Sequence, residues 1–269
     1  MANSLDIDLQ AEPEEPQKPR GALREFLTSW LPAILAVLVI RSVLIEPFQI
    51  PSGSMIPTLA IGDFIVVSKV GYGLRVPFTD IEIAPLGEPE RGDVIVFIYP
   101  PTQSKDPWCP AKRAARVVSF GLLPGPDQDC TTDFIKRIVG LPGDIIEMRG
   151  KALVVNGEPV AYAALARVEE PLGNGQLAAA SQWHEALPGR THVVQLLDDA
   201  SAHSRFGPIA VPAGHYLMLG DNRDLSGDSR VFGFVPRERL IGRAHRILVS
   251  ADILGDWAPR LARWGRALI

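Results

Sequence analysis

The chain has 269 residues, with 27 Lys and Arg against 31 Asp and Glu, and 46% of its residues are hydrophobic. The formal net charge of −4 excludes the basic footprint of a nucleic-acid-binding protein, and the ordinary hydrophobic content excludes bulk disorder. Gly and Pro number 24 each, above average usage, which favours a turn-rich β fold over a helical bundle. Two cysteines are too few for a four-cysteine zinc site, and the histidines show no metal-ligand spacing, so we expect neither a metal nor a cofactor.

The N-terminal part predicts a tail followed by a membrane anchor. Residues 1–24 are acidic and proline-rich at their start, which is typical of a disordered tail. Residues 25–45 then predict one transmembrane helix, because a helix from Phe26 to Ile45 would be about 30 Å long and Phe26–Ile40 carries no charge. Basic residues precede the span and none lies between Arg41 and Lys69, so the tail is expected in the cytoplasm and residues 46–269 outside it. A cleaved signal peptide and a buried core helix are the alternatives.

Short apolar runs bounded by Gly, Pro, Asp or Asn follow the predicted anchor and favour an antiparallel β fold. They are Phe64–Val67, Val94–Ile98, Phe134–Val139, Asp144–Met148, Ala152–Val155, Val193–Leu197 and Tyr216–Leu219. Asn156-Gly157 predicts a hairpin turn. Residues 100–130 and about 158–211 look irregular. The C-terminal Trp257–Ile269 is predicted either to lie on a membrane surface or to pack on the domain.

Pro51–Leu59 is the first of three unusual segments, and it holds Ser52 and Ser54 around Gly53 in an apolar setting. Glycine lets the backbone approach another chain closely, and the flanking prolines stiffen the loop. An ordinary Ser/Gly/Pro turn is the plain alternative.

Asp133–Asp144 is the second segment, a strand in which Phe134, Lys136 and Ile138 share one face. Apolar neighbours desolvate a lysine and lower its pKa, which makes it usable as a general base. A solvated surface lysine is the plain alternative, and Lys69 is the rival candidate for the base.

Gly220–Arg230 is the third segment, in which acidic side chains alternate with two arginines. A calcium loop is one interpretation, but the arginines and the missing final glutamate favour a loop held by arginine–carboxylate pairs.

Together these segments resemble bacterial signal peptidase I, the membrane-bound Ser/Lys leader peptidase family. The resemblance lies in four ordered blocks, namely Arg41–Leu59, Arg91–Phe97, Phe134–Asp144 and Gly220–Arg230. It implies a mainly β fold: an antiparallel β-sheet catalytic domain with a smaller β-rich lobe inserted at about 150–211, preceded by one N-terminal transmembrane helix.

The resemblance also implies the roles of individual residues. Ser54 is expected to be the nucleophile and Lys136 the general base, while Ser52 adds a donor to the oxyanion hole and Ser226 orients the lysine amine. Six side chains are expected to line pockets for small residues at positions −1 and −3 of a signal peptide: Phe48, Ile50, Met55, Leu59, Phe134 and Ile135. Structural roles are expected for Arg137, Asp228 and Arg230.

Two features stand apart from these blocks. Leu225 replaces the asparagine that is usual in the family's last block, so this loop must be held differently. Cys109 and Cys130 lie outside the cytoplasm on the predicted topology, where a disulfide is permitted; two buried free thiols are the alternative.

The predicted function is a membrane-anchored serine endopeptidase that cleaves signal peptides from exported preproteins. Its predicted place is the bacterial inner membrane, as a single-pass protein with the catalytic domain on the periplasmic side. The expected partners are preprotein signal peptides and the lipid bilayer, and not nucleic acid. One alternative is a specialised Ser/Lys maturation peptidase for one exported protein, such as a conjugation pilin. Another is a non-catalytic β-rich adaptor.

Overall fold

The computed structural model describes residue 21 and residues 25–75, 82–99, 132–172, 175–199 and 205–268. Cys109, Cys130 and nearly all of the predicted tail lie outside these residues, so the predictions made for them stay predictions. The chain divides into two compact units, residues 1–38 and residues 39–269.

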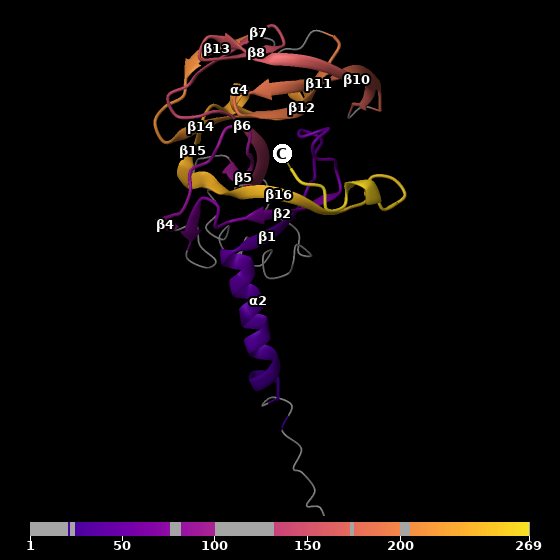
Figure 1. Cartoon of the computed structure of the whole chain (residues 1–269). Coiled ribbons are helices and arrows are strands. Elements are labelled where there is room, and N and C mark those ends of the chain that lie inside the picture. The colour runs from indigo at the N-terminus through magenta and orange to yellow at the C-terminus, as the bar shows by residue number, and fades with distance from the viewer. Residues whose placement is uncertain are drawn as a thin grey trace, which may run out of the picture. The chain divides into compact units, whose positions relative to one another are not determined.

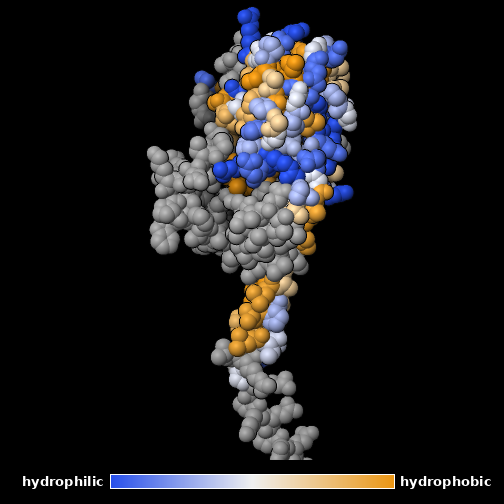
Figure 2. Space-filling model, turned by 90° about the vertical axis from the view of Figure 1, so that its left-hand side faces the viewer, coloured by the Kyte–Doolittle hydropathy of each residue, from blue (hydrophilic) through white to orange (hydrophobic). Residues whose placement is uncertain are grey.

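The N-terminal helical segment consists of a π-helical turn, η1 (Phe26–Trp30), followed by the α-helix α2 (Leu31–Val43). Apolar side chains along the segment are exposed, as Figure 2 shows in orange. Within the described residues, we find no helix with the length and apolar character needed to span a bilayer. Ile45 was predicted to be helical but instead begins a strand, because Pro47 disfavours helical backbone at the residue before it.

The main sheet has seven strands, and every neighbouring pair is antiparallel. In spatial order they are β1 (Ile45–Gln49), β2 (Asp63–Ser68), β16 (Leu240–Ser250), β5 (Val94–Tyr99), β6 (Thr132–Gly140), β14 (His215–Leu219) and β15 (Val235–Pro236). A separate pair, β3 (Gly73–Arg75) and β4 (Glu82–Pro85), forms a small two-stranded sheet. The antiparallel β fold predicted from the apolar runs is therefore confirmed.

The central strands of the main sheet are buried on both faces. Val94 and Val96 of β5 join one apolar cluster, and Ile95 and Phe97 join another. Successive side chains of a strand point to opposite faces, so a strand covered on both sides reads as a continuous apolar run. This burial places β6, the strand that holds Lys136, in the interior of the domain.

A long insertion separates β6 from β14, although the two strands are neighbours in the main sheet. We call residues 141–214 the insert. It contains a four-stranded sheet with the order β13 (Arg205–Ala210), β7 (Ile145–Arg149), β8 (Ala152–Val155), β9 (Glu158–Pro159). It also contains a three-stranded sheet of β10 (Ala161–Pro171), β11 (Leu177–Leu187) and β12 (Arg190–Leu197), labelled in Figure 1.

The prediction of irregular structure at about 158–211 was wrong, since β10 and β11 are the longest strands of the insert, with 11 residues each. Alanine has a low β propensity, and the alanines of both strands hide the pattern in the sequence. The Asn156-Gly157 hairpin was predicted correctly: both residues have positive φ, and Val155 pairs with Glu158 across the turn.

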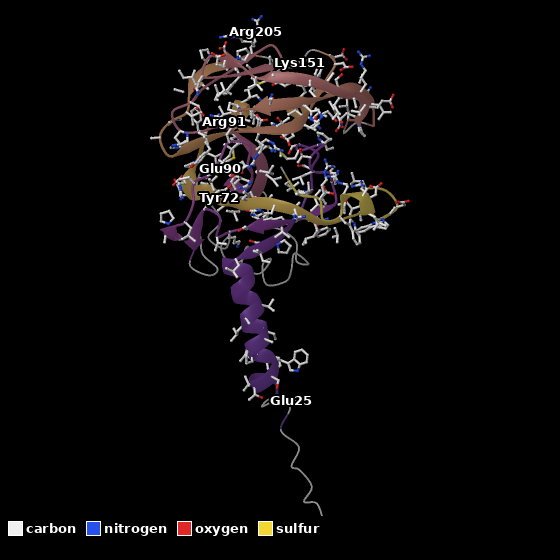
Figure 3. The ribbon with its side chains drawn as sticks, in the orientation of Figure 1. Glu25, Tyr72, Glu90, Arg91, Lys151 and Arg205 are labelled. Carbon is white, nitrogen blue, oxygen red and sulfur yellow. The ribbon has the colours of Figure 1, made fainter. Side chains whose placement is uncertain are left out.

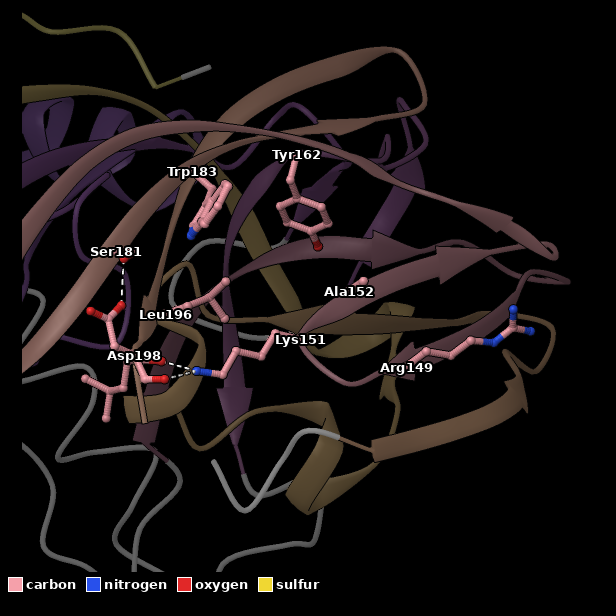
Figure 4. Close-up of a pocket in the computed structure, with 9 residues that line it drawn as sticks. Arg149, Lys151, Ala152, Tyr162, Ser181, Trp183, Leu196 and Asp198 are labelled. Atoms are coloured by element: carbon pink, nitrogen blue, oxygen red, sulfur yellow. Dashed lines mark hydrogen bonds between the residues drawn. The ribbon is translucent and has the colours of Figure 1, made fainter. Parts of the chain in front are cut away.

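Arg91, labelled in Figure 3, connects the main sheet to the beginning of the insert. Its guanidinium lies 2.8 Å from Asp144 and also donates to the carbonyl of Val139. Farther into the insert is a pocket of about 450 Å³, part of whose lining is labelled in Figure 4. The pocket is lined by Arg149, Lys151, Ala152, Tyr162, Ser181, Trp183, Leu196, Leu197 and Asp198, none of which belongs to the predicted site.

Short helical turns complete the fold, and the last of them belongs to the C-terminal segment. They are η2 (Arg223–Leu225), α4 (Ser229–Phe232), η3 (Arg237–Arg239) and η4 (Leu261–Arg263). The C-terminal segment packs on the domain, which is one of the two alternatives predicted for it. Trp264 donates to the carbonyl of Ser250 at 3.0 Å, and Arg263 forms an ion pair with Asp63 at 2.5 Å.

Candidate active site

Ser54 and Lys136 are brought into direct contact although they lie 82 residues apart in the chain. Lys136 is in β6, where it pairs with Ile95 of β5, and Ser54 lies in the turn between β1 and β2. The ammonium Nζ and the serine Oγ are 2.6 Å apart, within hydrogen-bond distance. Two of the unusual segments of the sequence, Pro51–Leu59 and Asp133–Asp144, therefore meet at this contact.

Burial alters the acid–base behaviour of Lys136. This residue is only 4% exposed. Desolvation is the main cause that lowers its pKa, to about 8, and the charge of Arg230 acts in the same direction. Asp228 and Asp221 oppose this effect without cancelling it. The ring of Phe134, on the same face of β6, has its centroid 5.7 Å from Nζ. A lysine with this pKa is partly neutral near physiological pH.

The rival lysine has a different partner. Lys69, the residue after β2, forms an ion pair at 2.6 Å with Glu46 of β1. This contact occupies its ammonium group, whereas Lys136 faces a serine hydroxyl.

The loop of residues 220–230 is held by arginine–carboxylate pairs. The Asp228 carboxylate caps α4 by accepting from the backbone N–H of Arg230, and it also accepts from the Arg230 guanidinium at 2.7 and 2.8 Å. It also accepts from the backbone N–H of Gly220, at 3.0 Å. Burial raises the pKa of this carboxyl group, but the arginine bonds outweigh that effect and hold it below its usual value.

A second buried pair connects β6 to the same loop. Arg137 is fully buried and donates from Nε and Nη2 to the two carboxylate oxygens of Asp221, at 2.9 and 2.8 Å. Asp221 also accepts from the Thr58 hydroxyl at 2.5 Å. Bidentate arginine–carboxylate geometry fixes both orientation and distance. Arg137 thus ties the strand that carries Lys136 to the loop beside Ser54.

The two remaining serines of the predicted site are in different surroundings. Ser52 is exposed, as a group that meets a substrate should be. The Ser226 hydroxyl is buried near the Asp228 carboxylate and helps to lower the pKa of that group, and no bond from this hydroxyl to the lysine amine is found among the described residues. Gly220 leaves room for this hydroxyl: an added Cβ at that position would lie 2.2 Å from Ser226 Oγ and 2.5 Å from the carbonyl oxygen of Ser54.

The six side chains predicted to line substrate pockets surround the serine turn and β6, but most of them are buried. Ile50, Met55, Leu59 and Ile135 belong to one core cluster, and Phe48 packs against it partly exposed. Phe134 packs on the other face of the sheet, where its ring meets Phe97 edge to face at 6.2 Å.

Two residues near Ser54 were not identified from the sequence. Asn222 donates from its backbone N–H to the carbonyl of Ser54, and Glu170 of the insert accepts a hydrogen bond from the Asn222 side chain. Asn222 lies within the fourth sequence block, which is a signal that could have drawn attention to it. Glu170 lies in the segment predicted to be irregular, and a single chain offers no signal there.

The arrangement places a serine hydroxyl next to an amine that can accept its proton, which is the requirement for nucleophilic catalysis without histidine. The described residues contain no group of three or more His, Cys, Asp or Glu side chains able to hold a metal ion.

Comparison with known proteins identifies the family of this chain. The family model "Signal peptidase, peptidase S26" matches residues 23–249. Signal peptidase I of Pseudomonas fluorescens is 38% identical over 239 residues, which cover 85% of this chain and 73% of that protein. Signal peptidase I of Pseudomonas aeruginosa is also 38% identical, with the same coverage, and that of Haemophilus influenzae is 34% identical over 91% of this chain and 74% of its own length. The resemblance predicted from the four sequence blocks is confirmed, and the chain belongs to the signal peptidase family of serine peptidases, peptidase S26.

Proposed function

We propose that this enzyme removes signal peptides from exported preproteins by a Ser54–Lys136 dyad, on the outer side of the inner membrane to which it is anchored. The observation that carries the proposal is the 2.6 Å contact between Lys136 Nζ and Ser54 Oγ, made by a lysine whose pKa is lowered to about 8. The family membership supports the choice of substrate.

In the first half of the reaction, Ser54 Oγ attacks the carbonyl carbon of the scissile peptide while its proton passes to the neutral amine of Lys136. The oxygen of the tetrahedral intermediate is stabilised by the Ser54 backbone N–H and the Ser52 hydroxyl. The intermediate collapses, the C–N bond breaks, and Lys136 returns the proton to the leaving amine. The signal peptide is then held as an ester on Ser54.

Water completes the cycle. Lys136 takes a proton from the attacking water, the ester bond breaks, and the lysine returns the proton to Ser54 Oγ. The products are the signal peptide with a new carboxyl end and the mature protein with a new amino end. Ser226, whose buried hydroxyl lies beside Gly220 and the Ser54 carbonyl, is proposed to turn toward the lysine amine during this sequence.

Substrate selection is proposed to follow from the shallow apolar surroundings of the serine turn. Phe48 and Phe134 are only partly buried, and they offer contact to small side chains at positions −1 and −3. The buried residues of the same group, Ile50, Met55, Leu59 and Ile135, would shape the pocket floors from behind. An extended substrate would add backbone hydrogen bonds along a strand edge.

Membrane anchoring is proposed for the N-terminal segment. Phe26, Trp30 and Leu35 are each more than two fifths exposed, which is unfavourable in water and favourable in lipid. The anchor would keep Ser54 close to the membrane surface, where signal peptides emerge. The β domain of residues 46–269 would then lie on the periplasmic side.

The test is cleavage of a panel of preproteins by the full chain in detergent, with Ser54→Ala, Lys136→Ala and Lys69→Ala as variants. We expect Ser54→Ala and Lys136→Ala each to lower kcat/KM by at least about 100-fold, the usual scale for a general base or a nucleophile, and Lys69→Ala to keep near wild-type turnover. Retained cleavage in Lys136→Ala refutes the dyad. Turnover of only one precursor in the panel would instead indicate a specialised maturation peptidase, and no turnover by wild type would favour the adaptor.

A further inference from the structure

Asn222 holds the turn that contains Ser54 by two separate contacts. Its backbone N–H donates to the carbonyl of Ser54 at 3.1 Å, and its side-chain Nδ2 donates to the carbonyl of Gly53, also at 3.1 Å. Asn222 is 1% exposed, so water does not compete for these bonds. Two successive carbonyl groups of the serine turn are therefore fixed by one buried residue.

Fixing the Gly53 carbonyl also fixes a donor. A peptide unit is planar and almost always trans, so its N–H points away from its C=O. The N–H in the same peptide unit as the Gly53 carbonyl is that of Ser54, the proposed backbone donor of the oxyanion hole. The Gly53 carbonyl accepts from Asn222 Nδ2 and from the backbone N–H of Ile56, each at 3.1 Å, and these two bonds together set the direction of the Ser54 N–H.

The Asn222 amide is oriented in turn by the insert. Its Nδ2 also donates to Glu170 Oε1, at 3.1 Å. The Glu170 carboxylate and the Gly53 carbonyl are both acceptors only. The Asn222 amide must therefore present its NH₂ group to both of them. The Asn222 oxygen is left buried without a partner among the described residues, an unfavourable arrangement that the two acceptors on the other side impose.

Glu170 is itself held rigidly. Its second oxygen, Oε2, accepts from Gln195 Nε2 at 2.7 Å, and Gln195 Oε1 accepts from Gln182 Nε2 at 2.9 Å. These three residues come from β10, β12 and β11, the whole three-stranded sheet of the insert, labelled in Figure 1. The backbone N–H of Gln195 also donates to the carbonyl of Asp221, next to Asn222.

We propose that Glu170 is a positioning residue for the oxyanion hole, acting through Asn222 and the Gly53 carbonyl on the direction of the Ser54 N–H. The inference rests on the proposed function. It also gives the insert a role in the reaction: its three-stranded sheet orients a donor that becomes important only when negative charge develops on the substrate oxygen.

The decisive variant is Glu170→Gln, which keeps the size of the side chain and removes one acceptor. Asn222 and Gln195 donate to different oxygens of Glu170, and a glutamine has an NH₂ group in place of one of them, so one donor would face another donor. The chain of bonds that orients the Asn222 amide is then broken. The matched control is Glu169→Gln, the same change at the adjacent, exposed position of β10. Both are compared with wild type as full chains in detergent, on a preprotein substrate.

We expect Glu170→Gln to lower kcat by about 10- to 100-fold, somewhat less than the loss of a whole oxyanion donor, with KM within about twofold of wild type. A peptide aldehyde related to the substrate should lose affinity by the same factor, because Ser54 Oγ adds to its carbonyl carbon and the carbonyl oxygen then occupies the oxyanion position. Glu169→Gln should match wild type in all three measurements.

A double-mutant cycle separates positioning from general destabilisation. If Glu170 acts through Asn222, the change Glu170→Gln should have little further effect on kcat in an Asn222→Ala background. The inference is overturned if Glu170→Gln has the kcat of wild type, or if it lowers kcat by the same factor in the Asn222→Ala background as in wild type. Preprotein cleavage by wild type would still support the proposed function in either case. Absence of cleavage by wild type overturns both.

Discussion

The main sheet and the insert contribute to the active site by different means. The main sheet supplies the contact between Ser54 and Lys136 directly, because β6 holds Lys136 opposite β5 and the turn between β1 and β2 holds Ser54. The insert contributes acidic and amide side chains that contact the loop behind the serine, such as Glu170 to Asn222 and Glu185 to Arg223. Strand register therefore places the chemistry, and buried polar contacts orient it.

The buried Arg137–Asp221 pair should be the most sensitive contact of the main sheet. Arg137→Ala leaves the Asp221 carboxylate buried without its cation, so we expect a loss of about 3–5 kcal/mol in the free energy of unfolding. Arg149→Ala in the insert removes an arginine whose side chain is 62% exposed and should have no more than a slight effect. Denaturant unfolding of both variants makes the measurement, and similar losses in the two would contradict the contrast between the regions.

Lys136 should lower the stability of the protein while serving its activity. Its folded pKa of about 8 lies below the ordinary value of 10.5, so the unfolded chain binds more protons between about pH 8 and pH 10.5. Stability is thus reduced at neutral pH and recovers as the pH rises from about 8 to about 10.5. Lys136→Met should be inactive and more stable near pH 7 by up to about 3 kcal/mol, with the gain vanishing at high pH.

The same pKa sets the expected pH profile of the wild-type enzyme. The rate of preprotein cleavage should rise with pH as Lys136 loses its proton, with a midpoint near about 8 for kcat/KM. Two results together would contradict the lowered pKa. One is an unfolding midpoint of Lys136→Met that equals that of wild type at every pH, and the other is a cleavage rate of wild type that does not change with pH.

The loop of residues 220–230 allows a matched pair of glycine substitutions. Gly220→Ala would place a methyl group 2.5 Å from the carbonyl oxygen of Ser54, while Gly227→Ala meets nothing within 4 Å. We expect Gly220→Ala to cost about 1–3 kcal/mol of stability and to lower cleavage strongly, because the serine turn must shift. Gly227→Ala should leave both unchanged. Equal behaviour of the two variants would show that the close approach at Gly220 is relieved elsewhere.

His192 of the insert should have the smallest effect, and only in acid. Burial lowers its pKa from 6.5 to about 4, with the charges of Arg137 and Arg223 acting in the same direction and those of Asp221 and Glu185 opposing. The unfolded chain therefore takes up a proton first, and stability falls as the pH drops from about 6.5 toward about 4. We expect this to cost about 1.5 kcal/mol near pH 5.5. The free energy of unfolding of His192→Gln should lack this part of the pH dependence. The same pH dependence in the variant and in wild type would contradict the prediction.

The sequence predicted the main sheet and marked the two segments that meet at Ser54 and Lys136, because both depend on local patterns. Apolar runs ended by Gly, Pro or Asp mark β2, β5 and β6, and the blocks around Ser54 and Lys136 are short and contiguous. In the three-stranded sheet of the insert, β12 was predicted in part from Val193–Leu197, but β10 and β11 were missed because their alanines give no apolar alternation. Glu170 was missed for a further reason: its partners, Asn222 and Gln195, are adjacent only after strands far apart in the chain have paired.

The junction of the insert has one more consequence. Gly140 and Leu217 are paired residues of β6 and β14, so the chain leaves and re-enters the main sheet at nearly the same point. An excursion that begins and ends side by side can change in length without altering the register of β6, and each doubling of a flexible loop costs only about 0.6 kcal/mol in closure entropy. The distance from Lys136 to Ser54 is thereby insulated from variation in the size of the insert. A shortened insert would preserve the sheet, and it would also preserve the proposed orientation of the Ser54 N–H if it still delivered a carboxylate to Asn222.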